Sequence, residues 1–265
     1  MLSPGDRFEG YVIEAALGHG GYATVYRAHH TAGADRTIAL KVLDEQHRHQ
    51  AQVAHLRREF EVAHQLDHPH IVRMYERGQG WLSMELLTGG RVDVLTTVPQ
   101  RLEALAQIAD ALDYIHNRGI VHCDVKPSNI LVQQSVSGSG AKLIDFGVAM
   151  SITDDIGYRP THVEASLPYS APELLTGHAP SGATDEYALA CTAVELLTGT
   201  PPFTSTSKVG LITAHLNSPP PRRSREIDWL PRVFDSILAK AMAKAPENRY
   251  QSCREFISLI TRALR

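Results

Sequence analysis

The sequence predicts an α+β protein of two lobes, a small β-rich N-terminal lobe with one main helix and a larger, mainly helical C-terminal lobe. Two observations predict it. The first third consists of β-rich runs separated by glycine-rich turns, with a single amphipathic segment among them. The remainder carries several apolar stripes at helical spacing. A chain of 265 residues is long enough to form two such lobes.

The N-terminal lobe is expected to contain five strands and one helix. Apolar residues recur at helical spacing from Val53 to Ala63, with charged residues between them. Asp67-His68-Pro69 ends this helix, because proline disfavours the α conformation of the residue before it. The strand-like runs are Phe8–Leu17, Tyr22–His29, Thr37–Leu43, Ile71–Glu76 and Trp81–Leu86.

The C-terminal lobe is expected to be built from helices with a few short strands. Pro99 opens a helix with one apolar stripe, and Gly119 closes it. The segment Gln133–Gly140 is rich in serine and glycine and predicts a flexible linker. Short strands are expected at 120–121, 130–132 and 142–144, and further helices near Asp185–Leu197, Ser207–Leu216, Leu230–Met242 and Ser252–Leu264.

Composition and charge exclude several classes of protein. A formal net charge of −3 gives no electrostatic reason to expect nucleic acid or an anionic membrane as a partner. The three cysteines, Cys123, Cys191 and Cys253, lie far apart without a CxxC pair, which favours a reducing compartment. The longest apolar stretch, 187–197, contains Glu195 and indicates a buried helix, so no membrane segment is expected in this chain.

A glycine cluster, Gly18-His19-Gly20-Gly21, separates the first two strands. Glycines let a backbone approach phosphates closely and present N–H groups to them. An ordinary glycine-rich hairpin turn is the competing interpretation, and Ala23 occupies the last glycine position of a G-x-G-x-x-G pattern.

Lys41 lies in an apolar strand, where a lone lysine is usually just an exposed residue. Its interest rises because Glu59 lies beside the apolar stripe of the following helix, facing the sheet. A lysine held by a carboxylate is a positioned cation for a polyphosphate.

The strongest chemical signal comes from two short loops, His122–Asn129 and Lys142–Gly147. Asn129 and Asp145 offer the oxygen ligands that Mg²⁺ prefers, while a triphosphate would fill the remaining positions. Asp124 could take a hydroxyl proton, and Lys126 could balance charge on a phosphoryl group in transfer. Ordinary solvated loops are disfavoured, because all these spacings coincide.

By these motifs the chain resembles the eukaryotic-like protein kinase family, and specifically its bacterial Ser/Thr branch, from about Phe8 to Leu264. The resemblance implies a two-lobed protein kinase fold over residues 1–265, with the N-lobe and hinge over about 1–87 and the C-lobe over 88–265. It implies transfer of the γ-phosphate of ATP to serine or threonine hydroxyls of protein substrates, with Mg²⁺ as the metal and Mn²⁺ as a possible substitute. It leaves a homodimer open.

The resemblance also assigns roles. Lys41 would bind the α- and β-phosphates and pair with Glu59, Asp124 would orient the acceptor hydroxyl, and Asn129 and Asp145 would hold the metal. Lys126, two positions after the catalytic aspartate, is typical of Ser/Thr kinases. Met84 would be the gatekeeper. The residues implied to bind nucleotide are Leu17, Gly18, Gly20, Val25, Ala39, Lys41, Met84, Glu85, Leu87 and Leu131.

Further residues match structural positions of the family. Ala171-Pro172-Glu173 matches the end of the activation segment, and Arg249 would be the buried partner of Glu173. Asp185 would brace the catalytic loop. Ser166 occupies the place of a threonine that touches the catalytic aspartate and lysine.

Cys123 departs from the family, since most members carry arginine there. That arginine normally meets a phosphorylated threonine of the activation segment, a contact that a short neutral side chain cannot make. We therefore expect activity without phosphorylation of this segment, whose candidate threonines are Thr153 and Thr161. The combination resembles atypical receptor kinases of the Pkn group, which implies the cytoplasmic domain of a membrane-anchored protein if the chain is a fragment. The Cys123 thiol could be redox-sensitive, and an inert thiol facing the backbone is the competing interpretation.

Two other functions compete with an active protein kinase. A pseudokinase scaffold is disfavoured because Lys41, Glu59, Asp124, Asn129 and Asp145 are all present. A small-molecule kinase of related fold is disfavoured by the Ser166–Glu173 segment, which in the family forms a docking surface for a protein chain.

Overall fold

The computed structural model describes residues 1–135, 138–151 and 163–265. It separates into two compact units, Met1–Thr88 and Gly89–Arg265, and each is described by itself. The first unit is β-rich with one main helix and the second is mainly helical, so the predicted α+β class is confirmed.

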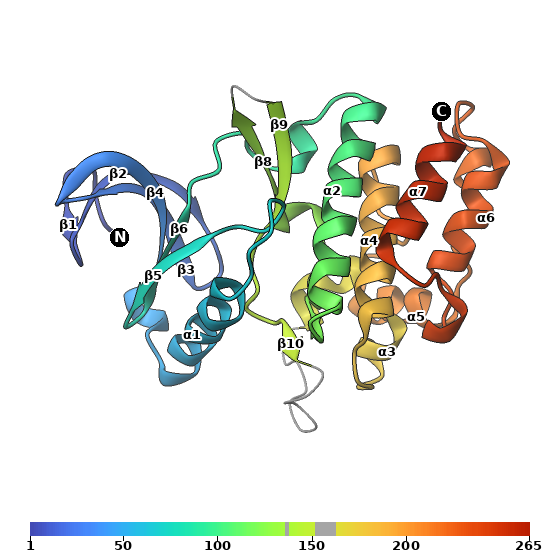
Figure 1. The fold of residues 1–265 in the computed structure, drawn as a ribbon. Coiled ribbons are helices and arrows are strands. Elements are labelled where there is room, and N and C mark those ends of the chain that lie inside the picture. Colours follow the sequence, from blue (N-terminus) through green and yellow to red (C-terminus); the bar gives the residue numbers. More distant parts are fainter. Residues whose placement is uncertain (136–137, 152–162) are drawn as a thin grey trace. The chain divides into compact units, whose positions relative to one another are not determined.

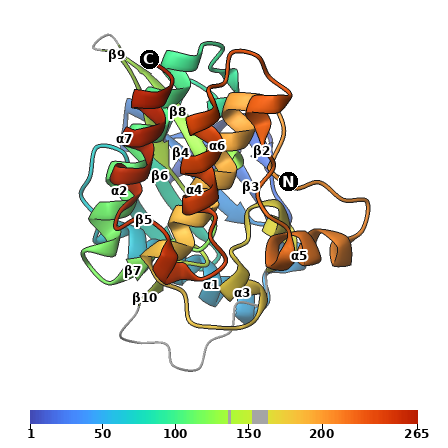
Figure 2. The same ribbon diagram turned by 90° about the vertical axis from the view of Figure 1, so that its right-hand side faces the viewer.

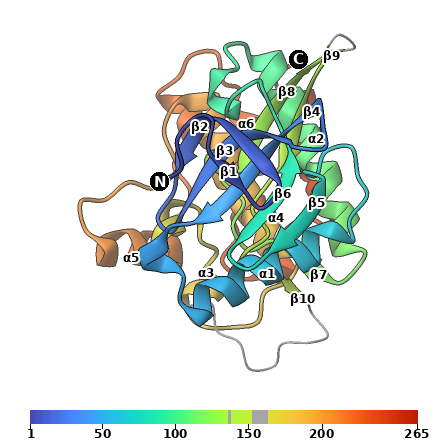
Figure 3. The same ribbon diagram turned by 90° about the vertical axis from the view of Figure 1, so that its left-hand side faces the viewer.

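One antiparallel six-stranded sheet forms most of the first unit, in the order β1-β2-β3-β4-β6-β5 (Figure 3). The short β1 was not expected. Glu9 and Gly10 both have positive φ, 48° and 84°, which suits the two-residue turn that pairs Phe8 with Tyr11. The strands are β1 (Arg7–Phe8), β2 (Tyr11–His19), β3 (Ala23–His30), β4 (Gly33–Leu43), β5 (Met74–Gly78) and β6 (Trp81–Glu85).

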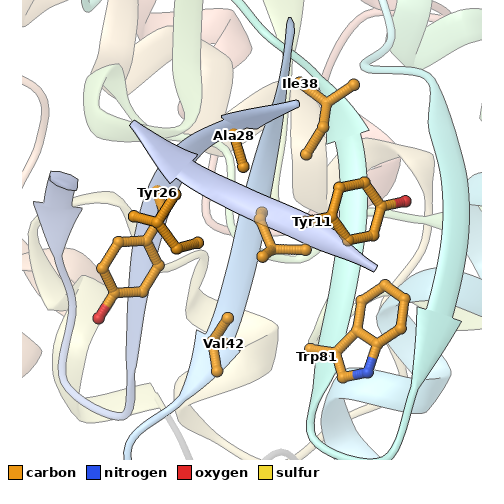
Figure 4. Close-up of a cluster of buried hydrophobic side chains, with 8 residues drawn as sticks. Tyr11, Tyr26, Ala28, Ile38, Val42 and Trp81 are labelled. Carbon is orange, nitrogen blue, oxygen red and sulfur yellow. The ribbon is translucent and has the colours of Figure 1, made fainter. Parts of the chain in front are cut away.

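The two faces of this sheet carry different residues, because side chains alternate along each strand. One face holds the buried apolar cluster that Figure 4 shows, with Trp81 and Tyr11 in edge-to-face contact at 5.7 Å between ring centroids. The cluster comprises Tyr11, Ile13, Tyr26, Ala28, Ile38, Leu40, Val42 and Trp81. The positions between these residues face the other way, and Lys41 is among them.

Helix α1 (Gln50–His64) follows a 3₁₀ turn at Glu45–His47 and packs on β5 and β6 (Figure 1). Its buried residues include Leu56, Phe60 and Ala63, which confirms three members of the predicted apolar stripe. Glu59 is buried among them, so one charged side chain enters this interface.

The second unit is organised around α4, which is buried on nearly every side. Helices α2, α6 and α7 pack against it (Figure 2). From Tyr187 to Leu197 the residues of α4 are mostly apolar on all sides, whereas its first turn buries the polar Thr184, Asp185 and Glu186. The helices are α2 (Val98–His116), α3 (Pro172–Leu175), α4 (Gly182–Thr198), α5 (Lys208–Asn217), α6 (Arg232–Ala241) and α7 (Cys253–Ala263). The strands are β7 (Ile120–Val121), β8 (Ile130–Ser135), β9 (Gly138–Leu143) and β10 (Met150–Ser151), and 3₁₀ turns lie at Val92–Val94, Pro127–Asn129, Val163–Tyr169, Arg223–Arg225 and Pro246–Asn248.

The linker predicted over Gln133–Gly140 is wrong for the residues that the structure describes. Strands β8 and β9 continue through them as a hairpin, paired as far as Ser135 and Gly138. The antiparallel ladder satisfies the backbone groups of this polar segment, which outweighs its weak local preference for strand. Gln107 of α2 also accepts a hydrogen bond from the backbone N–H of Ala141 at 2.6 Å.

Within the described ranges, the helices are all too short or too polar to cross a bilayer.

Glu173, at the start of α3, and Arg249 form a buried ion pair. The guanidinium donates from Nη1 to Oε1 at 2.7 Å and from Nη2 to Oε2 at 2.8 Å. Thr184 donates a further hydrogen bond to Oε1 at 2.9 Å. The guanidinium also donates to the backbone oxygens of Ala183 and Ala243. These contacts hold Glu173, the residue that follows Ala171-Pro172, against the rest of the second unit.

We predict that Arg249→Met lowers the free energy of unfolding by about 3–5 kcal/mol, because it leaves the buried Glu173 carboxylate uncompensated. Urea unfolding measures this loss. The double variant Arg249→Met/Glu173→Leu buries neither charge and should recover at least half of it. A single variant that loses less than about 1 kcal/mol would show that the pair is not a stabilising contact.

Candidate active site

Lys41 and Glu59 form a close ion pair in the first unit. The Lys41 ammonium donates to both carboxylate oxygens of Glu59, at 2.8 and 2.7 Å. The carboxylate side chain is only 2% exposed and the lysine 19%. Lys41 is therefore not the solvated strand residue of the competing interpretation. A buried carboxylate on α1 fixes its ammonium.

The strand register places several predicted nucleotide-binding residues on the same sheet face as Lys41. Val25 is directly opposite Lys41, and Ala39 is directly opposite Met84. Directly paired residues of antiparallel strands point to one face. This face therefore carries apolar residues next to Lys41, and Arg27 is paired with Ala39 further along it. It is opposite the face that bears the apolar cluster of Figure 4. Glu85 and Leu87 are partly buried where β6 ends.

The glycine-rich turn joins β2 to β3, closed by a hydrogen bond from Gly20 N–H to the Ala23 oxygen at 2.8 Å. Neither Gly18 nor Gly20 has a positive φ. A Cβ added at Gly18 would meet nothing within 4 Å, and one at Gly20 would meet only a backbone oxygen at 3.5 Å. The hairpin itself does not require these glycines. Leu17 beside them is 50% exposed.

In the second unit, three groups hold the carboxylate of Asp124. Lys126 donates to both of its oxygens, at 2.7 and 3.0 Å. Asn129 donates from Nδ2 to Oδ2 at 2.8 Å, and Ser166 donates a short hydrogen bond to Oδ1. Lys126 also donates to the Ser166 hydroxyl at 2.8 Å. The predicted contact of Ser166 with this pair is present, and it gives the carboxylate one orientation.

Asn129 and Asp145 lie at the same end of the β8–β9 hairpin. Ile130 pairs with Leu143, and the N–H of Ile144 donates to the oxygen of Asn129 at 3.0 Å. Asp145 follows with φ at +64°, a conformation that non-glycine residues rarely adopt. The hairpin thus brings the two predicted metal ligands from separate loops to one place. Leu131, also predicted to bind nucleotide, lies in β8 beside Arg91.

Asp185, fully buried at the start of α4, holds the loop before Asp124. Its carboxylate accepts hydrogen bonds from the backbone N–H groups of His122 and Cys123, at 2.7 and 2.8 Å. It also accepts one from Nε2 of His116 at 2.8 Å. Cys123 has φ at +64°, so the carboxylate stabilises a backbone conformation that is costly by itself. Its thiol donates to the oxygen of Val121 at 3.7 Å, as expected for a thiol that faces the backbone.

His122 connects the two loops, a role that sequence reasoning missed. Its Nδ1 accepts the N–H of Asp124 at 3.3 Å, so the other nitrogen carries the proton and donates to the oxygen of Ile144 at 3.2 Å. Its ring meets the edge of Phe146 with 4.8 Å between centroids. The residue precedes Asp124 by two positions, and this placement was the only signal available.

Two further contacts beneath the site were also missed. Tyr169 donates to Glu195 at 2.5 Å, and burial, followed by this hydrogen bond, raises the pKa of Tyr169. His215 of α5 shares a 2.9 Å hydrogen bond with the hydroxyl of Tyr187. Burial, followed by the nearby Lys244 ammonium, lowers the pKa of His215 to about 4, so this histidine is neutral at physiological pH. No spacing in the sequence pairs these residues.

The Lys41–Glu59 ion pair and the Asp124 carboxylate oriented by Lys126 and Asn129 are features expected of a phosphotransferase. The model of the protein kinase domain family matches residues 11–262, and the chain belongs to this family. Its fold is accordingly the protein kinase fold.

Similar curated proteins include bacterial Ser/Thr kinases of the Pkn group. Serine/threonine-protein kinase PknJ of Mycobacterium tuberculosis is 38% identical over 99% of this chain and 47% of its own length. PknF of the same organism is 37% identical over 96% of this chain and 56% of its own length. The chain therefore spans about half the length of these curated relatives.

The crystal structure of the M. tuberculosis PknI kinase domain superposes with a TM-score of 0.75 and 31% identity, covering 99% of this chain and 100% of that one. The missing arginine before Asp124 suggests PknI as a particular relative. The comparisons support the Pkn group without singling out PknI.

We predict that Ser166→Ala lowers kcat for phosphorylation of a protein substrate by about 10- to 100-fold, because a hydrogen bond to a charged group contributes about 1.5–3 kcal/mol. Ser166→Thr keeps the hydroxyl and should stay within about threefold of the parent. Steady-state kinetics at saturating ATP measure both. Equal losses in the two variants would show that the hydroxyl itself does not orient Asp124.

Proposed function

We propose that this chain is the catalytic domain of a Ser/Thr protein kinase, which transfers the γ-phosphoryl group of ATP to hydroxyl groups of protein substrates. The observation that carries the proposal is the Asp124 carboxylate held between Lys126, Asn129 and Ser166. Phosphoryl transfer depends on positioning and electrostatics rather than on covalent chemistry, and this cluster is an arrangement for positioning.

The first unit would hold the nucleotide. Lys41, fixed by Glu59, would neutralise the α- and β-phosphates, and the backbone N–H groups around Gly18 and Gly20 would cover them. Neither packing nor backbone φ requires glycine at positions 18 and 20. This supports the role, because a side chain there would lie between the backbone N–H groups and a phosphate. The remaining residues assigned to the base are the apolar Leu17, Val25, Ala39, Met84 and Leu131, and the backbone from Glu85 to Leu87.

The donor set at Asn129 and Asp145 fits a hard divalent cation. The amide nitrogen of Asn129 faces the backbone oxygen of Asp124 at 2.9 Å, and that oxygen can only accept a hydrogen bond. The amide oxygen therefore points away and is the atom that would meet a cation, beside the Asp145 carboxylate. Oxygen ligands of this kind suit Mg²⁺, and Mn²⁺ as a substitute. The metal would supply positive charge to offset the charge of the phosphates.

Asp124 would accept the proton of the acceptor hydroxyl as the oxygen attacks the γ-phosphorus. Lys126 and Asn129 keep the receiving oxygens in place, and the Lys126 ammonium offsets negative charge as the phosphoryl group moves. General-base assistance of this kind contributes about 10²–10⁴-fold in rate. Lys126 at this position supports serine and threonine as acceptors.

A nucleotide-binding pseudokinase is the second candidate, and a small-molecule kinase the third. The contacts of the assigned catalytic groups argue against a pseudokinase. Lys41 is hydrogen-bonded to Glu59, and Asp124 to Lys126 and Asn129. Protein substrates are favoured by the relatives, which are all named as serine/threonine-protein kinases. Because the chain spans about half the length of those relatives, we propose that it is the kinase domain of a longer protein. The resemblance to receptor kinases of the Pkn group supports a membrane-anchored protein with this domain in the cytoplasm.

Incubation with Mg·ATP and a generic protein substrate, followed by mapping of the phosphorylated residues, tests the proposal. Phosphoserine or phosphothreonine should appear, and the Asp124→Asn variant should yield at least about 10² times less. Nucleotide binding without transfer would favour the pseudokinase, and near-full activity of Asp124→Asn would remove the role of that aspartate.

We predict that Lys41→Met and Asp145→Asn each lower turnover by about 10² or more, because each removes a charge that offsets the phosphates. Steady-state kinetics give the loss, and circular dichroism shows whether the fold persists. As a matched control, Lys208→Met removes a surface lysine at the start of α5 and should leave turnover with ATP within about twofold.

We also predict that replacing Thr153 and Thr161 together with alanine lowers peptide phosphorylation by less than tenfold, since Cys123 cannot bind a phosphate. Both threonines lie outside the described residues. Activity of the protein expressed with and without a phosphatase gives a second measurement. A loss of tenfold or more in either experiment would refute independence from activation-segment phosphorylation.

A further inference from the structure

Asp113, His116 and Cys253 form a cluster where the end of α2 meets the start of α7, apart from the residues assigned to catalysis. One ligand atom from each, a carboxylate oxygen, a ring nitrogen and the sulfur, lie within 4.8 Å of one another. Asp113 and His116 are three residues apart on α2 and share a face. Cys253 is the first residue of α7 and is 1% exposed.

The hydrogen bond that His116 makes determines which of its nitrogens has a lone pair for a metal ion. Nε2 lies 2.8 Å from the buried Asp185 carboxylate, which accepts the hydrogen bond. Nε2 therefore carries the proton and Nδ1 carries a lone pair. A histidine that donates one N–H to a carboxylate and directs the other nitrogen elsewhere has the arrangement usual for metal ligands, in which the carboxylate fixes the tautomer and raises basicity.

Gly182 lies against the ring of His116 and lets it pack closely on the start of α4. It occupies the first turn of α4, where a Cβ would lie 2.9 Å from His116 Nδ1. Its φ is not positive, so the backbone does not require glycine there. Glycine in a helix is less favourable than alanine by up to about 1 kcal/mol, and the close approach of the His116 ring accounts for the choice.

Capping of α7 explains only part of the cluster. The Asp113 carboxylate accepts the N–H groups of Cys253 and Arg254, at 2.9 and 3.1 Å. Ser252 already caps the helix through its hydroxyl, which accepts the N–H of Glu255 at 3.1 Å. Each carboxylate oxygen retains a second lone pair. A cap has no need of a thiol and an unprotonated imidazole nitrogen beside it.

A cavity of about 550 Å³ adjoins the cluster and gives it a route to solvent. It is lined by Asp113, His116, Gly182, Glu186 and Cys253, among others. An ion could enter through it, and a water molecule could complete a coordination sphere. Entry and an open position are two requirements of a metal site that ligand identity alone does not meet.

We propose that Cys253 Sγ, His116 Nδ1 and a carboxylate oxygen of Asp113 bind Zn²⁺, with water as fourth ligand. Zinc is the divalent ion that accepts sulfur, nitrogen and oxygen together, whereas Mg²⁺ and Ca²⁺ prefer oxygen alone. With metal–ligand distances of about 2.0–2.3 Å, tetrahedral ligand atoms lie roughly 3.3–3.8 Å apart. Small side-chain rotations would bring the three atoms to this spacing. The sulfur–metal bond forms as the thiol releases its proton to solvent.

The site does not depend on the proposed function, but it lies one contact from the catalytic loop. His116 is hydrogen-bonded to Asp185, which in turn holds the N–H groups of His122 and Cys123. A bound ion would fix the ring of His116 in the orientation that this contact needs. It would also join the ends of α2 and α7.

Cobalt(II) replaces zinc in such sites and reports a thiolate ligand directly through a sulfur-to-metal charge-transfer band. The protein is stripped with a chelator and titrated with Co²⁺, in a Cys123→Ala background that removes the partly exposed thiol. The band should appear, and an equivalent of Zn²⁺ should abolish it. Cys253→Ala should remove it, whereas Cys191→Ala, which replaces another fully buried thiol in α4, should leave it unchanged.

Zinc affinity, measured by competition with a chelating dye, should fall at least about tenfold in Cys253→Ala. Gly182→Ala, which keeps the three ligand residues and displaces the ring of His116, should also weaken binding about tenfold, and it decides the matter if Cys253→Ala does not fold. Absence of the charge-transfer band in the parent, or its persistence in Cys253→Ala, would overturn the proposal. So would an unchanged zinc affinity in Gly182→Ala.

Discussion

The buried carboxylate of Asp185 is the constraint on which the arrangement of the catalytic loop depends. A charge removed from water is costly unless it is fully hydrogen-bonded. Asp185 meets this condition with two backbone N–H groups and an imidazole N–H, all within 2.8 Å. Because the donors come from α2 and from the loop, the carboxylate can be satisfied only when both are in place. The hydrogen bonds that stabilise the buried charge of Asp185 therefore also fix the conformation of the loop.

By holding the backbone of His122 and Cys123, Asp185 also affects the position of Asp124. Cys123, which directly precedes Asp124, is held with a positive φ. His122 then joins the loop to the backbone of Ile144, just before Asp145. The asparagine and lysine that orient Asp124 follow within a few residues. The Asp124 carboxylate is therefore positioned by the buried polar contacts of the loop that precedes it, and by Lys126 and Ser166.

Local pattern was enough to predict the elements and those contacts that lie in compact motifs. Helical spacing put Glu59 toward the sheet that carries Lys41, and the resemblance to protein kinases implied that the two residues pair. The contacts of Tyr169 with Glu195 and of Tyr187 with His215 could not be found this way. They join residues for which neither local spacing nor the resemblance to the kinase family assigned a partner. The prediction of a linker over Gln133–Gly140 failed for a related reason. Pairing between β8 and β9 outweighs the preference of serine and glycine for turns.

Cys123, which stands where most family members carry arginine, leaves the loop before Asp124 without a cation at that position. In this chain the loop around Cys123 is stabilised by Asp185, His122 and the backbone of Val121, all of which belong to the folded helical unit. None of these contacts needs a phosphate. An arginine at position 123 would add a buried or half-buried cation beside a carboxylate that is already satisfied, and that cation would then require a partner of its own. A neutral side chain avoids that requirement, and the order of the loop then follows from folding alone.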